Sequence, residues 1–427
     1  MGSILPCLAA IVLLVGCVRA GFEPAPAADS TADASDAGNA GAWTPLGGSS
    51  SGLGPVGRAV RVTNIRLAQS ADGKVHLAWV DDHSGARQVY LVLWDGSQWK
   101  DLGGSSSAGG VSASQGASRL GDLALDSQGR PLLTWMEQAT AGSVYLRRWS
   151  GSAWEELGGS ATDRGISGSG NPWWPALVLD SADRPTVAWE TYNIVPGGVI
   201  HLRRWNGQSW EEVAGSATGR GISGESGSAK FARLAGSGDD LHLGWLQEAG
   251  SQTCVAHRRL LGGSWAPMVA GNGCVSPAGE EVIAADLDLD DAMRPVVAWQ
   301  AKAGERSVIH LAAWDGTGWA GLGGSATGDG LSAGMEVARN PSLVVHGGRV
   351  TVAWEAVDAL GTNIYARAWI GGTWRELGGS FAAGGISHST LESTYPHLAR
   401  AADGLLVAWE EALSDTNVAA HLRLWAP

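Results

Sequence analysis

Short runs in which apolar and polar residues alternate recur from residue 42 to the end of the chain, and Gly, Asp, Ser or Pro separates them. One stretch contains four such runs in order: LALD (123–126), PLLTW (131–135), VYLRRW (144–149) and WEELGG (154–159). Alternation with a period of two is typical of β-strands, and the Asp-Gly or Asn-Gly pairs between some runs favour tight hairpins. The pattern therefore predicts units of four antiparallel strands that follow one another along the chain.

Tryptophan marks the repeat of this unit. A first series opens each WxxLGGS-like segment, a second closes each VAW-like segment, and a third ends each YLRRW-like segment. Members of the first series are 56, 55, 56, 55, 54 and 55 residues apart: Trp43, Trp99, Trp154, Trp210, Trp265, Trp319 and Trp374. The second series is Trp79, Trp135, Trp189, Trp245, Trp299, Trp354 and Trp409. Four strands per unit at this period favour a β-propeller over a solenoid or a sandwich.

The two ends of the repeat region complement each other. The region begins with a lone fourth strand at Ala42 and finishes after a third strand that starts near His421. Pairing these two fragments would complete one more unit and close a ring. We therefore predict an all-β, seven-bladed β-propeller over 42–427 with four-stranded blades. The first strand of each blade should line a central channel, and the WxxLGG strand should be outermost.

Composition narrows the classes of function. The chain has 63 Gly and only 17% charged residues, which favours turn-rich β structure. Its net charge of −13 argues against a nucleic-acid partner, because phosphates require a basic surface. The sequence contains no HExxH motif, no CxxC pair and no carboxylate cluster with ligand spacing, so we expect neither a metal nor another cofactor. We also expect a monomer.

The N-terminus predicts export. Residues 1–16 form an uncharged apolar run, which is typical of a signal peptide, and Cys17 follows it. LVGC (14–17) resembles the lipobox of bacterial lipoproteins, although no Lys or Arg precedes the apolar run as it usually does in that family. The resemblance implies a lipidated Cys17 anchored to the bacterial cell envelope, with the outer membrane favoured. Residues 17–41 would then be the lipidated Cys and a disordered Ala/Pro/Asp/Ser spacer. The alternative is an ordinary secretory signal ending near VRA (18–20), which would release a secreted protein.

The repeated W.G..W..LGG hairpin resembles that of bacterial, tryptophan-rich propeller lectins, and the resemblance covers 42–427. It implies sugars bound between blades or on loop faces, against aromatic rings. SADG (70–73) and LDSQG (125–129) give a weaker likeness to sialidase-like propellers with Asp-boxes. Here both the Asp–Gly spacing and the position on the hairpin differ from that family's motif.

Two tryptophans lie outside the three series, side by side in NPWWP (171–175). Trp174 falls three residues before a first-strand Leu, where other units have Leu, Phe or Tyr, so we expect it to be framework. Trp173 falls in a slot that is mostly polar in other units, so it is a candidate platform for a ligand. The alternative is a rim Trp covered by its own loops. Glu190, Tyr192 and Asn193 on the neighbouring loop could hydrogen-bond a sugar stacked on Trp173.

Charged residues should form a collar at the same rim. Basic residues stand four positions before the first-strand Leu, and acidic residues directly follow second-series tryptophans. The basic members are Arg119, Lys230 and Arg339, and the acidic members are Glu190, Glu355 and Glu410. Mutual ion pairing is the simpler interpretation, and each exposed pair would contribute little. Orientation of a ligand over the channel is the functional interpretation.

Two further cysteines, Cys254 and Cys274, lie at the third strand and after the fourth strand of one unit. Export favours a disulfide between them. The sequence alone leaves open whether they are bonded.

Loops between strands two and three, and between strand four and the next unit, are long and share one face, where binding usually occurs. We therefore predict a membrane-tethered, non-catalytic binding module that recognises a glycan or a cell-envelope or extracellular protein, and that meets the membrane only through its lipid anchor. We assign no catalytic residues. The alternatives are a glycan hydrolase or lyase with a site at the channel mouth, or a structural scaffold of the envelope.

Overall fold

The computed structural model describes residues 41–427 except 139–141, 169, 193–196, 225–226, 270–272 and 403. Strands dominate the described residues, and helical structure there is limited to the short 3-10 turns η2 (Gly54–Val56), η3 (Leu322–Gly324) and η4 (Gly330–Ser332). No helix in these ranges is long and apolar enough to cross a membrane. The predicted all-β class is confirmed.

The strands form sheets in which neighbours along the chain pair antiparallel. The first two sheets are β2 (Thr63–Gln69), β3 (Val75–Asp81), β4 (Gln88–Trp94), β5 (Trp99–Lys100), and β6 (Ala117–Leu125), β7 (Pro131–Gln138), β8 (Val144–Trp149), β9 (Trp154–Glu155). The third is β10 (Pro172–Leu179), β11 (Pro185–Thr191), β12 (Val199–Trp205), β13 (Trp210–Glu212). The predicted four-stranded antiparallel unit is confirmed in these sheets.

A larger, eight-stranded sheet follows. Its strands are β14 (Ser228–Ser237), β15 (Asp240–Ala249), β16 (Gln252–Leu261), β17 (Ser264–Ala266), β18 (Glu281–Leu289), β19 (Pro295–Ala303), β20 (Arg306–Trp314) and β21 (Trp319–Ala320). One parallel residue pair, Thr253 with Glu281, joins its two antiparallel halves. The next sheet is β22 (Ala338–His346), β23 (Arg349–Val357), β24 (Thr362–Ile370) and β25 (Thr373–Arg375).

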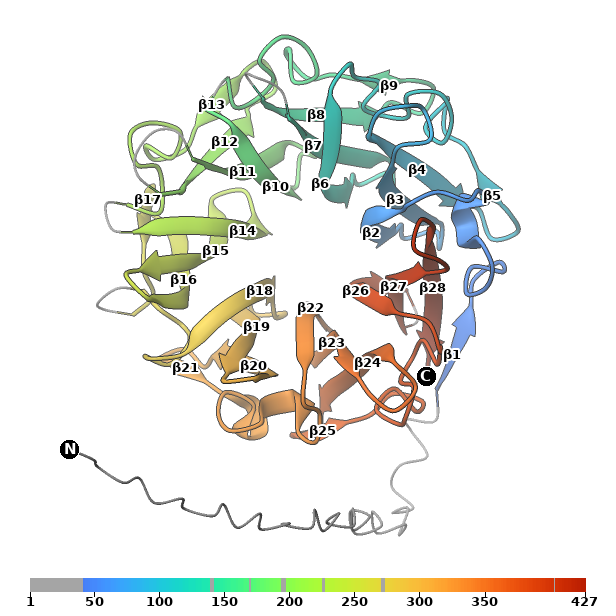
Figure 1. Ribbon diagram of the computed structural model, residues 1–427. Helices are drawn as coiled ribbons and strands as arrows, with labels where there is room; N and C mark the ends of the chain where they lie inside the picture. The colour runs from blue at the N-terminus through green and yellow to red at the C-terminus, as the bar shows by residue number, and fades with distance from the viewer. Residues whose placement is uncertain are drawn as a thin grey trace, which may run out of the picture. The chain divides into compact units, whose positions relative to one another are not determined.

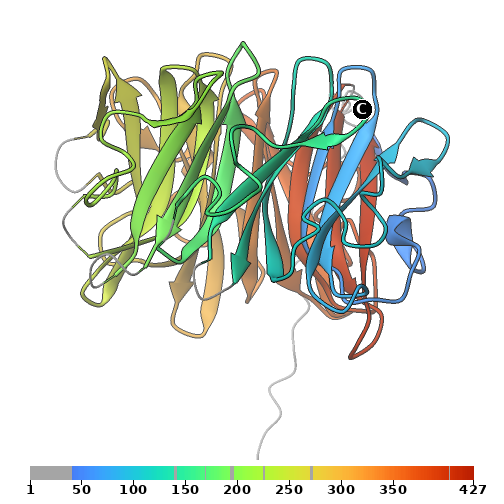
Figure 2. The same cartoon turned by 90° about the horizontal axis from the view of Figure 1, so that it is seen from above.

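The last sheet contains both ends of the described chain. Its strands are β26 (Ser393–Ala401), β27 (Gly404–Ala412), β28 (Val418–Ala426) and β1 (Ala42–Pro45). β1 pairs antiparallel with β28, from Ala42 opposite Ala426 to Pro45 opposite Arg423. The sheets stand around a central opening in a propeller-like arrangement, and the first strand of each unit, such as β6 or β22, lies innermost (Figure 1). Figure 2 shows the strands running between the two faces.

The WxxLGGS motif holds neighbouring units together. Trp154 Nε1 donates to the carbonyl of Leu102 in the preceding unit at 2.8 Å. Gly103 has a φ of 60°, and a Cβ there would lie 2.7 Å from the Trp149 ring, so only Gly fits. Ser105 Oγ accepts from the Leu102 N–H at 3.0 Å and fixes the turn. The same indole-to-carbonyl bond is made by Trp43, Trp210, Trp265 and Trp374.

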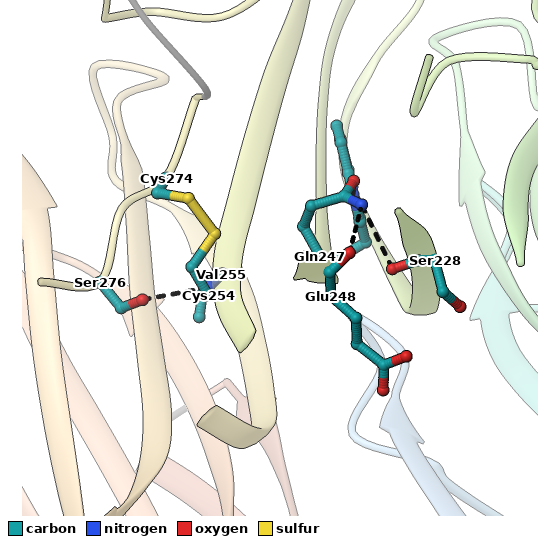
Figure 3. Close-up of a disulfide and its surroundings, with 8 residues drawn as sticks. Ser228, Gln247, Glu248, Cys254, Val255, Cys274 and Ser276 are labelled. Carbon is teal, nitrogen blue, oxygen red and sulfur yellow. Dashed lines mark hydrogen bonds between the residues drawn. A yellow bond between two sulfur atoms is a disulfide. The ribbon is translucent and has the colours of Figure 1, made fainter. Parts of the chain in front are cut away.

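The unit that contains Trp265 has no serine at the position equivalent to Ser105, and it contains a disulfide. The segment after Trp265 reads APMVAGNGC, and its Cys274 is bonded to Cys254 on β16 (Figure 3). Around the bond, Val255 N donates to Ser276 Oγ at 3.2 Å. Where Cys274 stands, another unit has Gly165, at which a Cβ would lie 2.3 Å from a carbonyl oxygen. The disulfide therefore adds a covalent link to a segment that backbone bonds, such as Val275 N to the Val255 carbonyl at 2.7 Å, also hold.

Candidate functional site

Each first strand carries a β-bulge where its register against the second strand shifts. At five of these bulges a residue other than Gly has a positive φ between 47° and 57°: Asn64, Trp174, Phe231, Asn340 and Tyr395. We call these five residues the bulge ring. A left-handed conformation strains a bulky side chain by about 1–3 kcal/mol, and such strain concentrates at functional sites. The bulge ring is therefore the first candidate for a binding surface.

Acidic or amide side chains from the preceding unit hold four of these bulges. Each acceptor directly follows a second-series tryptophan, and its side-chain oxygen accepts the N–H of the bulge residue. The bonds are Glu410 to Asn64 (2.7 Å), Glu190 to Phe231 (2.5 Å), Gln300 to Asn340 (3.2 Å) and Glu355 to Tyr395 (2.7 Å). The unit before Trp174 has Met136 at this position, which offers no such oxygen. The collar glutamates Glu190, Glu355 and Glu410 thus connect neighbouring units, and we call them struts.

Burial changes the charge of these struts. Loss of water raises the pKa of Glu410 to about 8 and that of Glu190 to about 7, although the bulge N–H groups oppose the rise. The pKa of Glu355 is raised for the same reason. At neutral pH the collar therefore carries less negative charge than three glutamates would suggest.

The simpler interpretation of the collar, in which its basic and acidic residues pair with each other, does not match the ion pairs among the described residues. In those ranges no ion pair joins Arg119, Lys230 or Arg339 to a collar glutamate. Lys230 Nζ instead pairs with Glu248 Oε1 at 2.6 Å, which lies on β15 of its own unit. The physical reason is that the glutamates are buried and already accept backbone N–H groups.

Trp173 is half-buried between two neighbours. Its ring packs edge-on against Tyr192, with centroids 6.4 Å apart and planes at 86°. The guanidinium carbon of Arg119, from the preceding unit, lies 5.6 Å from the Trp173 ring centroid. Glu190 is opposite Trp173 in the β10–β11 register but is only 1% exposed, so it does not present a free acceptor to solvent. Asn193 lies outside the described residues.

Trp174, the expected framework residue, contacts the next unit from a left-handed backbone position. It has a φ of 47°, is half-buried, and its ring centroid lies 6.0 Å from that of Phe231 in the next unit. Tyr395 occupies the same slot and is 58% exposed. In other units Leu120 is only 1% exposed and Phe231 packs against a core cluster, so alignment on the first-strand Leu does not fix the exposure of this slot.

On several of the innermost strands, a charged residue directly precedes the first-strand Leu, and basic and acidic residues alternate at this position: Arg66, Asp122, Arg233 and Asp286. Arg66 Nε lies 3.7 Å from an Asp122 oxygen, and Arg233 Nε lies 3.3 Å from an Asp286 oxygen. Burial among these charges lowers the pKa of His397 to about 3. Each of these four charges therefore has a partner within the protein. Among the described residues, no group of His, Cys, Asp and Glu side chains is arranged to hold a metal ion.

Sequence reasoning missed both the bulge ring and the channel charges. The signal for the charges is a polar residue before the first-strand Leu in most units. The signal for the bulge ring is a Glu or Gln after the second-series Trp, paired with an aromatic or Asn residue in the following unit.

Neither a protein-family model nor a curated protein sequence matches this chain. Its fold is similar to that of a polysaccharide lyase, PL25 ulvan lyase, bound to -[GlcA(1-4)Rha3S]-, with a TM-score of 0.53 and 12% identity over 88% of this chain and 95% of that one. A second structure of PL25 ulvan lyase gives a TM-score of 0.52, again with 12% identity over 88% and 95%. At this identity the likeness shows the fold alone.

Proposed function

We propose that the channel mouth binds a glycan. The observation that carries the proposal is the bulge ring: three aromatic and two amide side chains are held at left-handed bulges around one opening. Aromatic faces stack on the apolar faces of sugar rings, and amides pair with sugar hydroxyls. The ulvan lyase structure with its bound saccharide supports the proposal only by showing that a fold of this kind accommodates a glycan.

This proposal rests on a seven-bladed interpretation of the fold. We count each four-strand repeat as a blade, so that the eight-stranded sheet contributes two blades and β1 completes the last one. Export and anchoring through a lipidated Cys17 belong to the same proposal, as does a monomeric chain. They would place the mouth at the end of a spacer, within reach of envelope or extracellular glycans.

A glycan array probed with the full chain tests the proposal. We expect retention on a restricted set of glycans. Failure to bind any glycan, together with capture of one defined envelope protein, would replace the glycan with a protein partner.

A second candidate function is cleavage of the bound glycan by a lyase or hydrolase. One observation favours it: the Glu190 carboxyl has a pKa near 7 and interacts with Tyr192, whose own pKa is raised by burial and by that carboxyl. A carboxyl group whose pKa lies near neutrality is suited to general acid–base catalysis. New reducing ends, or unsaturated products, after incubation with uronate polymers would establish it, and unchanged polymer length would leave binding alone.

A further inference from the structure

We infer that Arg119, Trp173 and Tyr192 form a subsite for the carboxylate of a uronic acid residue. The inference rests on the proposed glycan-binding function and names the chemical class of the ligand. The aromatic rings and amides of the bulge ring alone would suit neutral sugars. This subsite would add the recognition of a charged sugar.

The three side chains converge from two neighbouring units. Arg119 is on β6, Trp173 is the second residue of β10, and Tyr192 directly follows β11. The Arg119 guanidinium lies against the Trp173 ring, and the Tyr192 ring braces the same indole edge-on. Pro172 and Pro175 flank the tryptophan pair and restrict its backbone. The subsite is therefore pre-organised, which reduces the entropy lost on binding.

Arg119 lacks the counter-charge that a half-buried arginine needs. In the described ranges no carboxylate lies within ion-pair distance of it, and its Nε is buried without a hydrogen-bond partner. Burial lowers the pKa of Arg119, and the positive charge of Arg87 lowers it further. An unpaired buried cation is unfavourable, so a ligand anion would relieve a cost that the free protein carries.

Two other stacked arginines, Arg58 and Arg147, do have a polar partner within the protein. Arg58 lies 5.4 Å from the Trp79 ring centroid and also pairs with Asp81 at 2.8 Å. Arg147 stacks at 6.0 Å on Trp135, and its Nη1 donates to the Val111 carbonyl at 2.6 Å. Arg119 has the stacking contact without such a partner, and it alone of these three stacks on a tryptophan outside the repeat series.

The collar carboxyl opposite Trp173, that of Glu190, does not supply the missing charge. Glu190 Oε2 accepts the Phe231 N–H, and burial favours the neutral form of this side chain. A planar guanidinium matches a carboxylate through two parallel hydrogen bonds, a geometry that an ammonium cannot copy. A pyranose bearing that carboxylate could then stack on the exposed part of Trp173.

The test compares polyglucuronate and polygalacturonate with their carboxyl-reduced, neutral counterparts, using the full chain. We expect the wild type to bind a uronate polymer about 10- to 100-fold more tightly than its neutral form, the range for a charge-assisted hydrogen-bonded pair. Arg119→Gln should abolish the preference, so that the variant binds the uronate polymer and its neutral form with equal affinity. Arg119→Lys should retain part of it, because charge remains but the fork geometry is lost.

The matched control is Arg148→Gln, which removes one positive charge where Arg148 pairs with Glu155 on the outer strands. It should leave the preference intact. Equal affinity for uronate and neutral polymers in the wild type, or equal losses in Arg119→Gln and Arg148→Gln, would overturn the inference while glycan binding stands. A preference for sulfated over uronate polymers would also overturn it. Binding to no polymer would overturn both the inference and the proposed function.

Discussion

Strain at the bulge ring makes a prediction that is independent of any ligand. At Tyr395 the backbone has a φ of 52°, and 58% of the residue is exposed. Tyr395→Ala and Tyr395→Gly both remove the side chain and its partial burial. They differ only in that Ala keeps a Cβ in the left-handed region.

The magnitude follows from two opposing terms. A Cβ in the left-handed region raises the energy by about 1–2 kcal/mol, whereas Gly gives up roughly 0.5–1 kcal/mol of backbone entropy on folding. The Gly variant should therefore be more stable than the Ala variant by about 0.5–1 kcal/mol. Urea unfolding of the two variants, compared at their midpoints, measures this difference.

Val357 provides the control, because it lies on β23, is 48% exposed and has no positive φ. There the order should reverse, with Gly less stable than Ala by roughly 0.5–1 kcal/mol. If Tyr395→Ala matched or exceeded Tyr395→Gly in stability, the bulge would not be strained, and the argument that strain marks this site would fail.

Three further predictions follow from the struts, the disulfide and the tryptophan pair. Glu410 has a pKa near 8 when folded and an ordinary one near 4.3 when unfolded, so its contribution to stability is most favourable below about pH 4 and is lost as pH rises to 8. As the pH rises from 5 to 8, the unfolding free energy of Glu410→Gln, measured by urea titration, should therefore increase relative to that of the wild type by roughly 2–4 kcal/mol. A difference that does not change with pH would contradict the assigned burial. Reduction of Cys254–Cys274, 20 residues apart, should lower the unfolding free energy by about 3 kcal/mol, and a Cys254→Ala/Cys274→Ala variant should not respond to reductant. Trp173→Ala should weaken binding of uronate polymers at nearly unchanged melting temperature, whereas Trp174→Ala should lower affinity as well as stability because its ring also packs on Phe231; loss of stability alone in both would remove the tryptophan pair from the site.

The repeat of the sequence predicts the strands well because each unit contains its own alternation and its own marker tryptophans. Trp79, Trp354 and Trp409 are each at most 1% exposed, as expected for residues that fill a core between sheets. WxxLGGS is visible as a motif for the same reason, although its role in joining units is not.

The candidate site is less visible because contacts between units decide it. Glu190 is 41 residues from Phe231, and Glu355 is 40 residues from Tyr395, so a pattern confined to one unit cannot show the strut. The positive φ occurs with that contact at four bulges and without it at Trp174, so neither feature can be read from one unit alone. The missing partner of Arg119 is equally a property of the folded chain, since many acidic residues are available in the sequence.

The central claim, that the channel mouth binds a glycan, is tested most directly by one array experiment with two proteins. The wild-type chain and a Trp173→Ala/Tyr395→Ala variant of matched melting temperature would be applied to the same immobilised glycans. We predict that the wild type is retained, most strongly on uronate-containing glycans, and that the variant loses this retention. Equal retention of both proteins, or no retention of the wild type on any glycan, would contradict the claim.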